Sequence, residues 1–205
     1  MTLFLKGLLF GFLLAATVGP MWVLCFRRTV AYGPLAGFVS GMGIAVADGI
    51  YGTVAAFGLT AISGFLLRHS FWIGLVGGIF LIYLGAKILL SKPTLDGTAQ
   101  PQLSHSKAFL STLGLTLANP PTILAFAAIF AGLGLVTSDY GSAALVVLGV
   151  FLGSASWWIV LAAATGWLRG KLGEMRGPRL LRFINLVAGL SILGFALWQF
   201  AQLLG

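Results

Sequence analysis

The residue of this sequence with the clearest capacity for chemistry is Asp48, an acid inside a long apolar run. It lies about twelve residues into a run over 36–64, so at 1.5 Å rise per residue it falls near the middle of a bilayer. A carboxylate at that depth costs roughly 2.5 to 3.5 kcal/mol on insertion scales, so it should face a polar cavity or a partner. No Lys or Arg occurs at comparable depth, and an unpaired carboxyl group there can exchange a proton near physiological pH. A hydrogen bond to backbone at a helix break is the structural alternative.

Two aromatic residues are candidates for the same site. Tyr51 lies three residues after Asp48, so a helix would place the hydroxyl and the carboxyl group on one face. Trp157 falls at similar depth in a later apolar run, over 141–166, where it could form a wall of a cavity. Plain packing explains Trp157 equally well, and both interpretations stand.

Prolines break two of the apolar runs at positions one hundred residues apart. Pro20 follows Gly19 in the first run, and Pro120 follows Asn119 in the fourth. Three identities share this offset: Pro20 with Pro120, Leu24 with Leu124, and Phe26 with Phe126. Proline removes a backbone hydrogen bond that lipid cannot replace, so such breaks belong where protein or water covers them. Paired breaks in equivalent helices favour a binding site formed by discontinuous helices, although each proline alone could be a packing kink.

Six apolar runs are long enough to position these residues across a membrane, since a bilayer helix needs about 20 residues. They cover residues 3–26, 36–64, 71–90, 108–134, 141–166 and 183–204. Each half of the chain holds three runs, and an odd number of crossings makes any repeat inverted. The sequence therefore predicts an all-α integral membrane protein of six transmembrane helices in two inverted three-helix repeats, over 1–90 and 108–205, with a cytosolic loop at 91–107.

The basic residues lie mostly on one side of this predicted topology. Ten of the twelve Lys and Arg flank the first, third and fifth connections, and only Lys6 and Arg68 lie on the other side. Because cytoplasmic loops carry an excess of Lys and Arg, these three connections are predicted to be cytosolic and both termini to be outside. The cations are also expected to contact anionic lipid headgroups rather than nucleic acid.

Composition excludes several other classes of protein. Of the 205 residues 59% are hydrophobic and 8% are charged, against roughly 25% charged in soluble domains, so little is left for a soluble domain. Cys25 is the only cysteine, so the chain cannot form an intramolecular disulfide or a thiol-redox pair. His69 and His105 lie at the ends of runs, and no second acid accompanies Asp48. We therefore predict no enzymatic active site, no metal site and no cofactor.

Small residues recur at every fourth position in the first two runs. They are Gly7, Gly11, Ala15 and Gly19, then Gly37, Gly41, Ala45 and Gly49. Gly149 and Gly153 continue the pattern in the fifth run. This spacing predicts close helix contact, which needs no ligand.

Four short motifs resemble those of one protein family. In chain order they are Gly19-Pro20, Gly43-Ile44-Ala45-Val46-Ala47-Asp48, Tyr83-Leu84-Gly85 and Asn119-Pro120. With Trp157-Trp158 and Asn185 further along, the chain resembles a LysE/RhtB-type amino-acid exporter over nearly its whole length.

The resemblance implies a bacterial inner-membrane exporter of amino acids or related small zwitterionic metabolites, driven by the proton gradient. It carries over as candidate site residues Gly19, Pro20, Asp48, Asn119 and Pro120. The family commonly has Asn-Pro-Lys where this chain has Asn119-Pro120-Pro121. This difference bears on the charge of the site and therefore on the substrate.

We interpret these features as a transport mechanism. Helices that begin after the breaks at Pro20 and Pro120 would direct positive dipole ends toward a substrate carboxylate, and Asp48 would hold the ammonium group. Protonation of Asp48 from outside would release the substrate, and deprotonation toward the cytosol would reload the site. One carboxylate favours neutral amino acids. The expected partners are the amino acid, a proton and membrane lipids; export of another small solute or a metal ion, a scaffold without transport, and a homodimer are open alternatives.

Overall fold

The computed structural model is helical throughout the part of the chain that it describes, which comprises residues 2–57, 65, 68–91, 103–119, 122, 125, 126, 130, 135, 139–172 and 178–204. The helices are α1 (Thr2–Ala16), α2 (Pro20–Tyr32), α3 (Pro34–Ala56), α5 (Ser70–Leu89), α6 (His105–Leu117), α8 (Tyr140–Leu172) and α9 (Pro178–Leu204). By length and composition, α3, α5, α8 and α9 can each cross a membrane. The chain is therefore a multi-pass membrane protein.

A fifth candidate span consists of α1 and α2, which meet at an angle of 73°. The expected run over 3–26 is thus divided after Ala16, and a second helix begins at Pro20. Proline has no N–H to donate to an earlier turn, and it suits the first position of a new helix. The fourth expected run, 108–134, begins as α6, and most of its residues after Asn119 lie outside the described residues.

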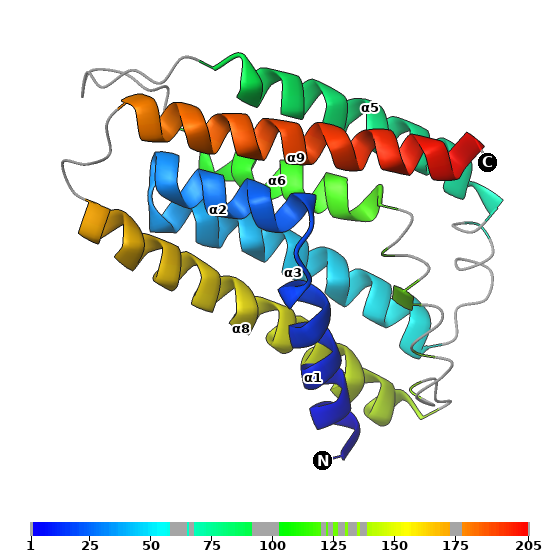
Figure 1. Cartoon of the computed structure of the whole chain (residues 1–205). Helices are drawn as coiled ribbons and strands as arrows, with labels where there is room; N and C mark the ends of the chain where they lie inside the picture. Colours follow the sequence, from blue (N-terminus) through cyan, green and yellow to red (C-terminus); the bar gives the residue numbers. More distant parts are fainter. Residues whose placement is uncertain are drawn as a thin grey trace.

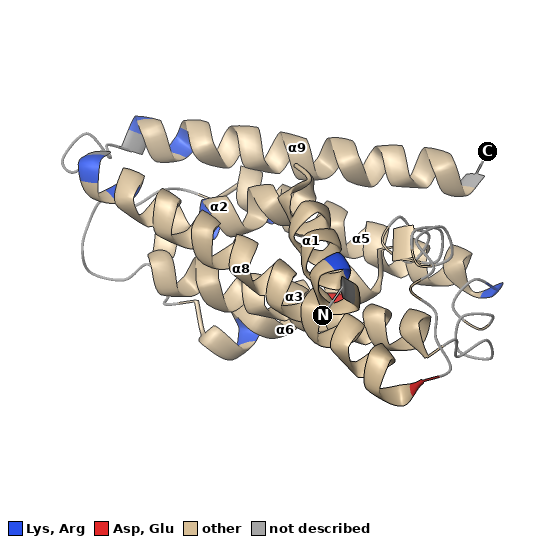
Figure 2. Ribbon diagram, turned by 90° about the horizontal axis from the view of Figure 1, so that it is seen from below, with Lys and Arg blue, Asp and Glu red and all other residues tan. Residues whose placement is uncertain are grey.

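The helices form a bundle in which α3 is central (Figure 1). On one side of it α5 and α9 lie side by side, and on the other α8 runs along α3 and is crossed by α1. One end of the bundle collects the last residues of α2, α5 and α8 and the first residues of α3, α6 and α9. Most of the described Lys and Arg lie toward this end, and we call it the basic end (Figure 2).

The connection from α2 to α3 is a single glycine. Gly33 has a φ of 104°, in the left-handed region that favours glycine, and its N–H donates to the carbonyl of Thr29 at 2.9 Å. Arg27 and Arg28, which hydropathy assigned to a loop, therefore lie inside α2, and both are buried.

The predicted close helix contacts are present between α1 and α8. A Cβ atom on Gly7 or Gly11 would collide with the backbone of α8, and one on Gly149 or Gly153 would collide with the backbone of α1. The two helices therefore touch backbone to backbone, which is the contact that small residues at this spacing permit. Gly49 in α3 differs, because its nearest neighbour, the Phe151 side chain, is at ordinary contact distance.

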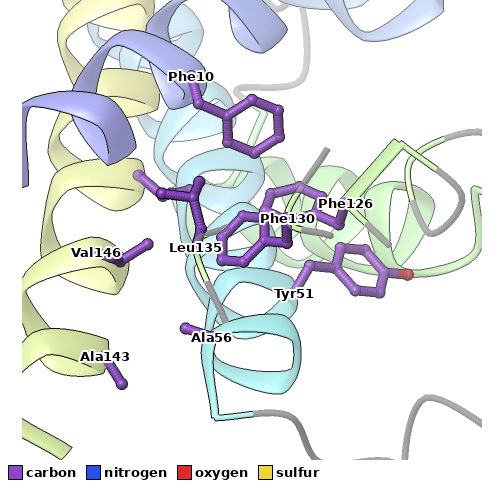
Figure 3. Close-up of a cluster of buried hydrophobic side chains, with 9 residues drawn as sticks. Phe10, Tyr51, Ala56, Phe126, Phe130, Leu135, Ala143 and Val146 are labelled. Carbon is purple, nitrogen blue, oxygen red and sulfur yellow. The ribbon is translucent and has the colours of Figure 1, made fainter. Parts of the chain in front are cut away.

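An aromatic cluster fills the space between α1, α3 and α8 (Figure 3). Phe10 meets the rings of Phe126 and Phe130 edge to face, with centroids 5.1 and 5.7 Å apart. Tyr51 of α3 packs against Phe126 at 5.6 Å. The cluster therefore packs Phe126 and Phe130, which follow α6 in the sequence, against α1.

Candidate functional site

A cavity of about 290 Å³ lies where the break between α1 and α2 meets the end of α6. Residues from both predicted breaks line it, including Gly19 and Pro20 on one side and Asn119 on the other. Asp48 lines it from α3. Four of the predicted site residues, far apart in sequence, therefore meet at one cavity. Pro120, the other predicted proline, lies outside the described residues.

The first turn of α2 offers hydrogen-bond donors to this cavity. Gly19 makes no side-chain cap, and its carbonyl accepts the first helical bond, from the Val23 N–H at 3.1 Å. The backbone N–H groups of Met21 and Trp22 lie before Val23 in the first turn, so they have no acceptor within the helix. Both residues line the cavity, so a helix N-terminus with its partial positive charge adjoins it.

Asp48 is held by a short chain of side-chain hydrogen bonds. Its side chain is only 2% exposed, and its Oδ2 accepts a hydrogen bond from the Ser154 hydroxyl at 2.7 Å. The indole N–H of Trp158 donates to the Ser154 oxygen at 3.2 Å. Both partners are on α8, which presses on α3 because Gly41 leaves room for Trp158. These two hydrogen bonds fix one carboxylate oxygen of Asp48, and Asp48 itself lines the cavity.

Two residues that line the cavity each carry a buried oxygen atom without a hydrogen-bond partner: the Asn119 Oδ1 and the Thr116 Oγ1. The amide nitrogen of Asn119 donates to the Thr122 hydroxyl at 3.0 Å, which fixes the side chain. Buried polar atoms are nearly always satisfied in native structures, so unsatisfied acceptors beside a cavity indicate a ligand or water that donates to them. Together with Asp48 they form a group of acceptors suited to an ammonium ion.

Two predicted site residues lie away from the cavity lining. The Tyr51 hydroxyl donates to the Leu117 carbonyl at 2.7 Å, so it binds the end of α6 and not Asp48. Trp157 packs edge to face on Phe12 of α1, and its neighbour Trp158 lines the cavity instead. Sequence reasoning missed Thr116, whose only signal was its position three residues before Asn119 on the approach to the break.

The remaining wall of the cavity is apolar, with contributions from Leu14, Val18, Ile44, Ala125 and Phe195. No group of three potential metal ligands from His, Cys, Asp and Glu occurs in the described residues. The cavity lining thus combines hydrogen-bond donors, acceptors and apolar surface, which suits a small molecule carrying both charges.

Comparisons with known proteins agree with a transport role. A protein-family profile described as LysE type translocator matches residues 12–201. A putative amino acid efflux protein, YcgF of Bacillus subtilis (strain 168), is 27% identical over 204 residues, covering 97% of this chain and 95% of that protein. Leucine efflux proteins of Salmonella choleraesuis and Salmonella typhimurium are each 25% identical over 184 residues, covering 87% of this chain and 85% of theirs. No solved structure matches the chain. The match over most of the sequence shows that this chain belongs to the LysE type translocator family.

Proposed function

We propose that this protein exports a neutral, apolar amino acid from the cytosol in exchange for a proton. The observation that carries the proposal is that one cavity adjoins both the uncapped N-terminus of α2 and the carboxyl group of Asp48. An amino acid is a small zwitterion, and these two features are complementary to its two charges.

The substrate carboxylate would accept hydrogen bonds from the amides of Met21 and Trp22, where the helix dipole also favours a negative charge. The ammonium group would donate to Asp48 and to the free oxygens of Thr116 and Asn119. A branched apolar side chain fits the remaining wall, and the relatives named leucine efflux proteins are consistent with that choice. A cavity of this size lies near the lower end of the roughly 300 to 1,000 Å³ typical of ligand pockets, as expected for a small substrate.

Coupling to protons would depend on Asp48. In the charged state it attracts the ammonium group, and proton uptake from outside removes that attraction and releases the amino acid. Loss of the proton toward the cytosol restores the site for another substrate. Asp48 suits this role because its described hydrogen-bond partner, the Ser154 hydroxyl, is neutral and leaves the charge of the carboxylate uncompensated.

The same proposal includes the architecture: two inverted three-helix halves, over 1–90 and 108–205, in a bacterial inner membrane with both termini outside. The two breaks that are one hundred residues apart line one cavity, as expected for symmetry-related helices. The basic end of the bundle supports a cytosolic position for the connections that lie there. A tag at Gly205 that labels from outside intact cells would support this topology, and a cytosolic tag would overturn it.

Counterflow in proteoliposomes tests the substrate. We expect labelled leucine to exchange with leucine, and two analogues, isopentylamine without the carboxylate and 4-methylpentanoate without the amine, to compete about tenfold to a hundredfold more weakly. The range reflects about 1.5 to 3 kcal/mol for hydrogen bonds to a charged group. Lysine should also compete weakly, because no second acid lines the cavity among the described residues.

Equal competition by either analogue would contradict recognition of both charges. If no amino acid tested exchanged although the protein was folded in the liposomes, export of another solute or a scaffold role would be the better interpretation.

A further inference from the structure

A second cavity, of about 380 Å³, lies toward the basic end, between the last turns of α2, the last turns of α5 and the start of α6. We call it the basic pocket. Four cations line it: Arg27, Arg28, Lys87 and Lys107. No carboxylate is among the described residues that line it. The pocket therefore concentrates positive charge with no described counter-charge.

The two arginines are buried, with exposures of 8% for Arg27 and 4% for Arg28. Arg27 donates to the Asn185 amide oxygen at 2.8 Å and to the Ser91 hydroxyl at 3.5 Å. Its guanidinium carbon also lies 5.9 Å from the centre of the Tyr32 ring. All of these partners are neutral, so they orient the guanidinium without compensating its charge.

Arg28 has the same kind of surroundings. It donates to the Ser40 hydroxyl and the Ala108 carbonyl, both at 3.0 Å, and to the Ser111 hydroxyl at 2.8 Å. These bonds link α2 to α3 and α6. An arginine carries five N–H donors, so the two arginines leave several donors that no described residue uses. A buried charge is costly unless it is paired, and the pairing group here is missing from the described chain.

The start of α6 adds further positive potential. Ser104 precedes the helix and makes no side-chain cap, and it lines the pocket together with Lys107 of the first turn. The helix N-terminus and the lysine both favour an anion in the pocket that the two arginines also line.

One wall of the basic pocket is apolar and continues onto the outer surface of α5. Phe80, Leu84 and Ile88 line the pocket, and Phe80 and Ile79 are exposed on the same helix. Lys87 lies at the rim, with its ammonium 5.6 Å from the centre of the exposed Tyr83 ring. In a membrane protein such a surface faces acyl chains, so the cationic pocket adjoins a lipid-facing surface.

We infer that the basic pocket binds an anionic phospholipid, with the phosphate between Arg27, Arg28 and Lys107 and an acyl chain along α5. A ligand with a charged head and an apolar tail matches both walls, whereas free phosphate matches only one. The site is separate from the cavity at Asp48 and does not depend on which solute is exported.

The test uses the full chain purified in a neutral detergent. Native mass spectrometry measures retention of dioleoylphosphatidylglycerol and of dioleoylphosphatidylcholine, and thermal unfolding is followed with each lipid and with inorganic phosphate. We expect phosphatidylglycerol to be retained and to raise the unfolding midpoint, and phosphatidylcholine and phosphate to have much smaller effects.

The variant Lys87→Gln/Lys107→Gln should bind phosphatidylglycerol about thirtyfold more weakly, since each basic residue near the surface contributes about fivefold. Both lysines are exposed, so the fold should persist. The matched control Lys6→Gln/Lys171→Gln removes the same charge from exposed positions outside the pocket and should bind like the parent protein.

Three results would overturn the inference. Equal losses in the two double variants would indicate general attraction to a basic protein, and an equal stabilisation by inorganic phosphate would indicate a soluble anion. The chain's own acids Asp96 and Glu174 lie outside the described residues. A tenfold gain in phosphatidylglycerol affinity in Asp96→Asn or Glu174→Gln would show that one of these carboxylates occupies the pocket instead.

Discussion

The cavity at Asp48 and the basic pocket lie at opposite ends of α2 and differ in the kind of charge that they hold. At the N-terminus of the helix the charged side chain is a carboxylate, which a proton can neutralise. Near the C-terminus the buried charges belong to two arginines, which stay protonated in proteins, and two lysines add further positive charge. The first site can therefore change its affinity during a cycle, and the second cannot. The contrast suits a substrate that must leave and a lipid that stays.

The largest effect expected is from Asp48→Asn, which keeps the shape of the side chain and removes its charge and its proton. We expect export of labelled leucine driven by a pH gradient to be abolished in proteoliposomes, because the ammonium group loses its counter-charge and no proton is exchanged. Thermal unfolding checks that the variant is folded.

The matched control for this variant is Asp139→Asn, at the other acid that the structure describes, which does not line the cavity. It should transport normally. If Asp48→Asn exported leucine normally under a pH gradient, protonation of Asp48 would not control transport. The contrast between the cavity at Asp48 and the permanently charged basic pocket would then fail.

The walls of the first cavity depend on backbone contact between α1 and α8, and Gly11→Ala tests this. Its Cβ would collide with the backbone of Val150, so we expect a loss of about 3 kcal/mol in unfolding free energy, as for overpacked cores. Gly114→Ala is the matched control, because nothing lies within 4 Å of its Cβ position. The control should gain roughly 0.5 to 1 kcal/mol in the helix interior. Similar behaviour of the two variants in chemical denaturation would contradict the close contact.

Arg28→Lys tests the second region with its charge preserved. A single ammonium group cannot reach Ser40 and Ser111 on two different helices as the guanidinium does, so we expect a loss of about 2 kcal/mol. For a chain of this size that is a fall of about 4 to 8 °C in the unfolding midpoint. The exposed Arg68→Lys should change it little. Transport by Arg28→Lys, measured on the folded fraction, should stay near normal, in contrast to Asp48→Asn.

The smallest effect concerns Asp139, at the start of α8. Hydrogen bonds from the side chain and the backbone N–H of Ser142, the latter at 2.8 Å, hold the pKa of Asp139 below its ordinary value. A lowered pKa in the folded state means that this stabilisation is present at neutral pH and is lost as the pH falls through the folded-state pKa. Asp139→Asn should therefore weaken this small dependence of unfolding on acid pH. An identical dependence in the variant and the parent protein would contradict a stabilising role for the hydrogen bonds from Ser142.

The candidate site residues that follow from local physics could be named from the sequence. A lone acid in an apolar run must find polar surroundings, and prolines must break helices, so Asp48, Pro20 and Asn119 could be assigned to one site. Which of two neighbouring residues faces the cavity could not be predicted from the sequence. Consecutive helix residues point about 100° apart, and both Trp157 and Trp158 are apolar enough to face either the cavity or another helix. The structure puts Trp158 at the cavity.

The basic pocket could not be predicted, because the partners that bury its arginines come from distant elements. Arg27 meets Asn185 of α9, and Arg28 meets Ser111 of α6. Hydropathy ends the first run before Arg27 since it scores each charge as if it were in water. Gly33 followed by Pro34 was the available signal, because glycine commonly follows the end of a helix and proline suits the first position of the next one.

The single-glycine connection at Gly33 has a mechanical consequence. A Cβ there would meet the Arg169 side chain of α8 at 2.6 Å, so the corner between α2 and α3 is tightly enclosed. At the other end of α2, a Cβ on Gly19 would meet nothing within 4 Å. The helix α2 is thus about 20 Å long, enclosed at its C-terminal corner and open at its N-terminal residue. Movement of α2 about this corner would displace Met21 and Trp22, which line the cavity, most, and Arg27 and Arg28, near the corner, least.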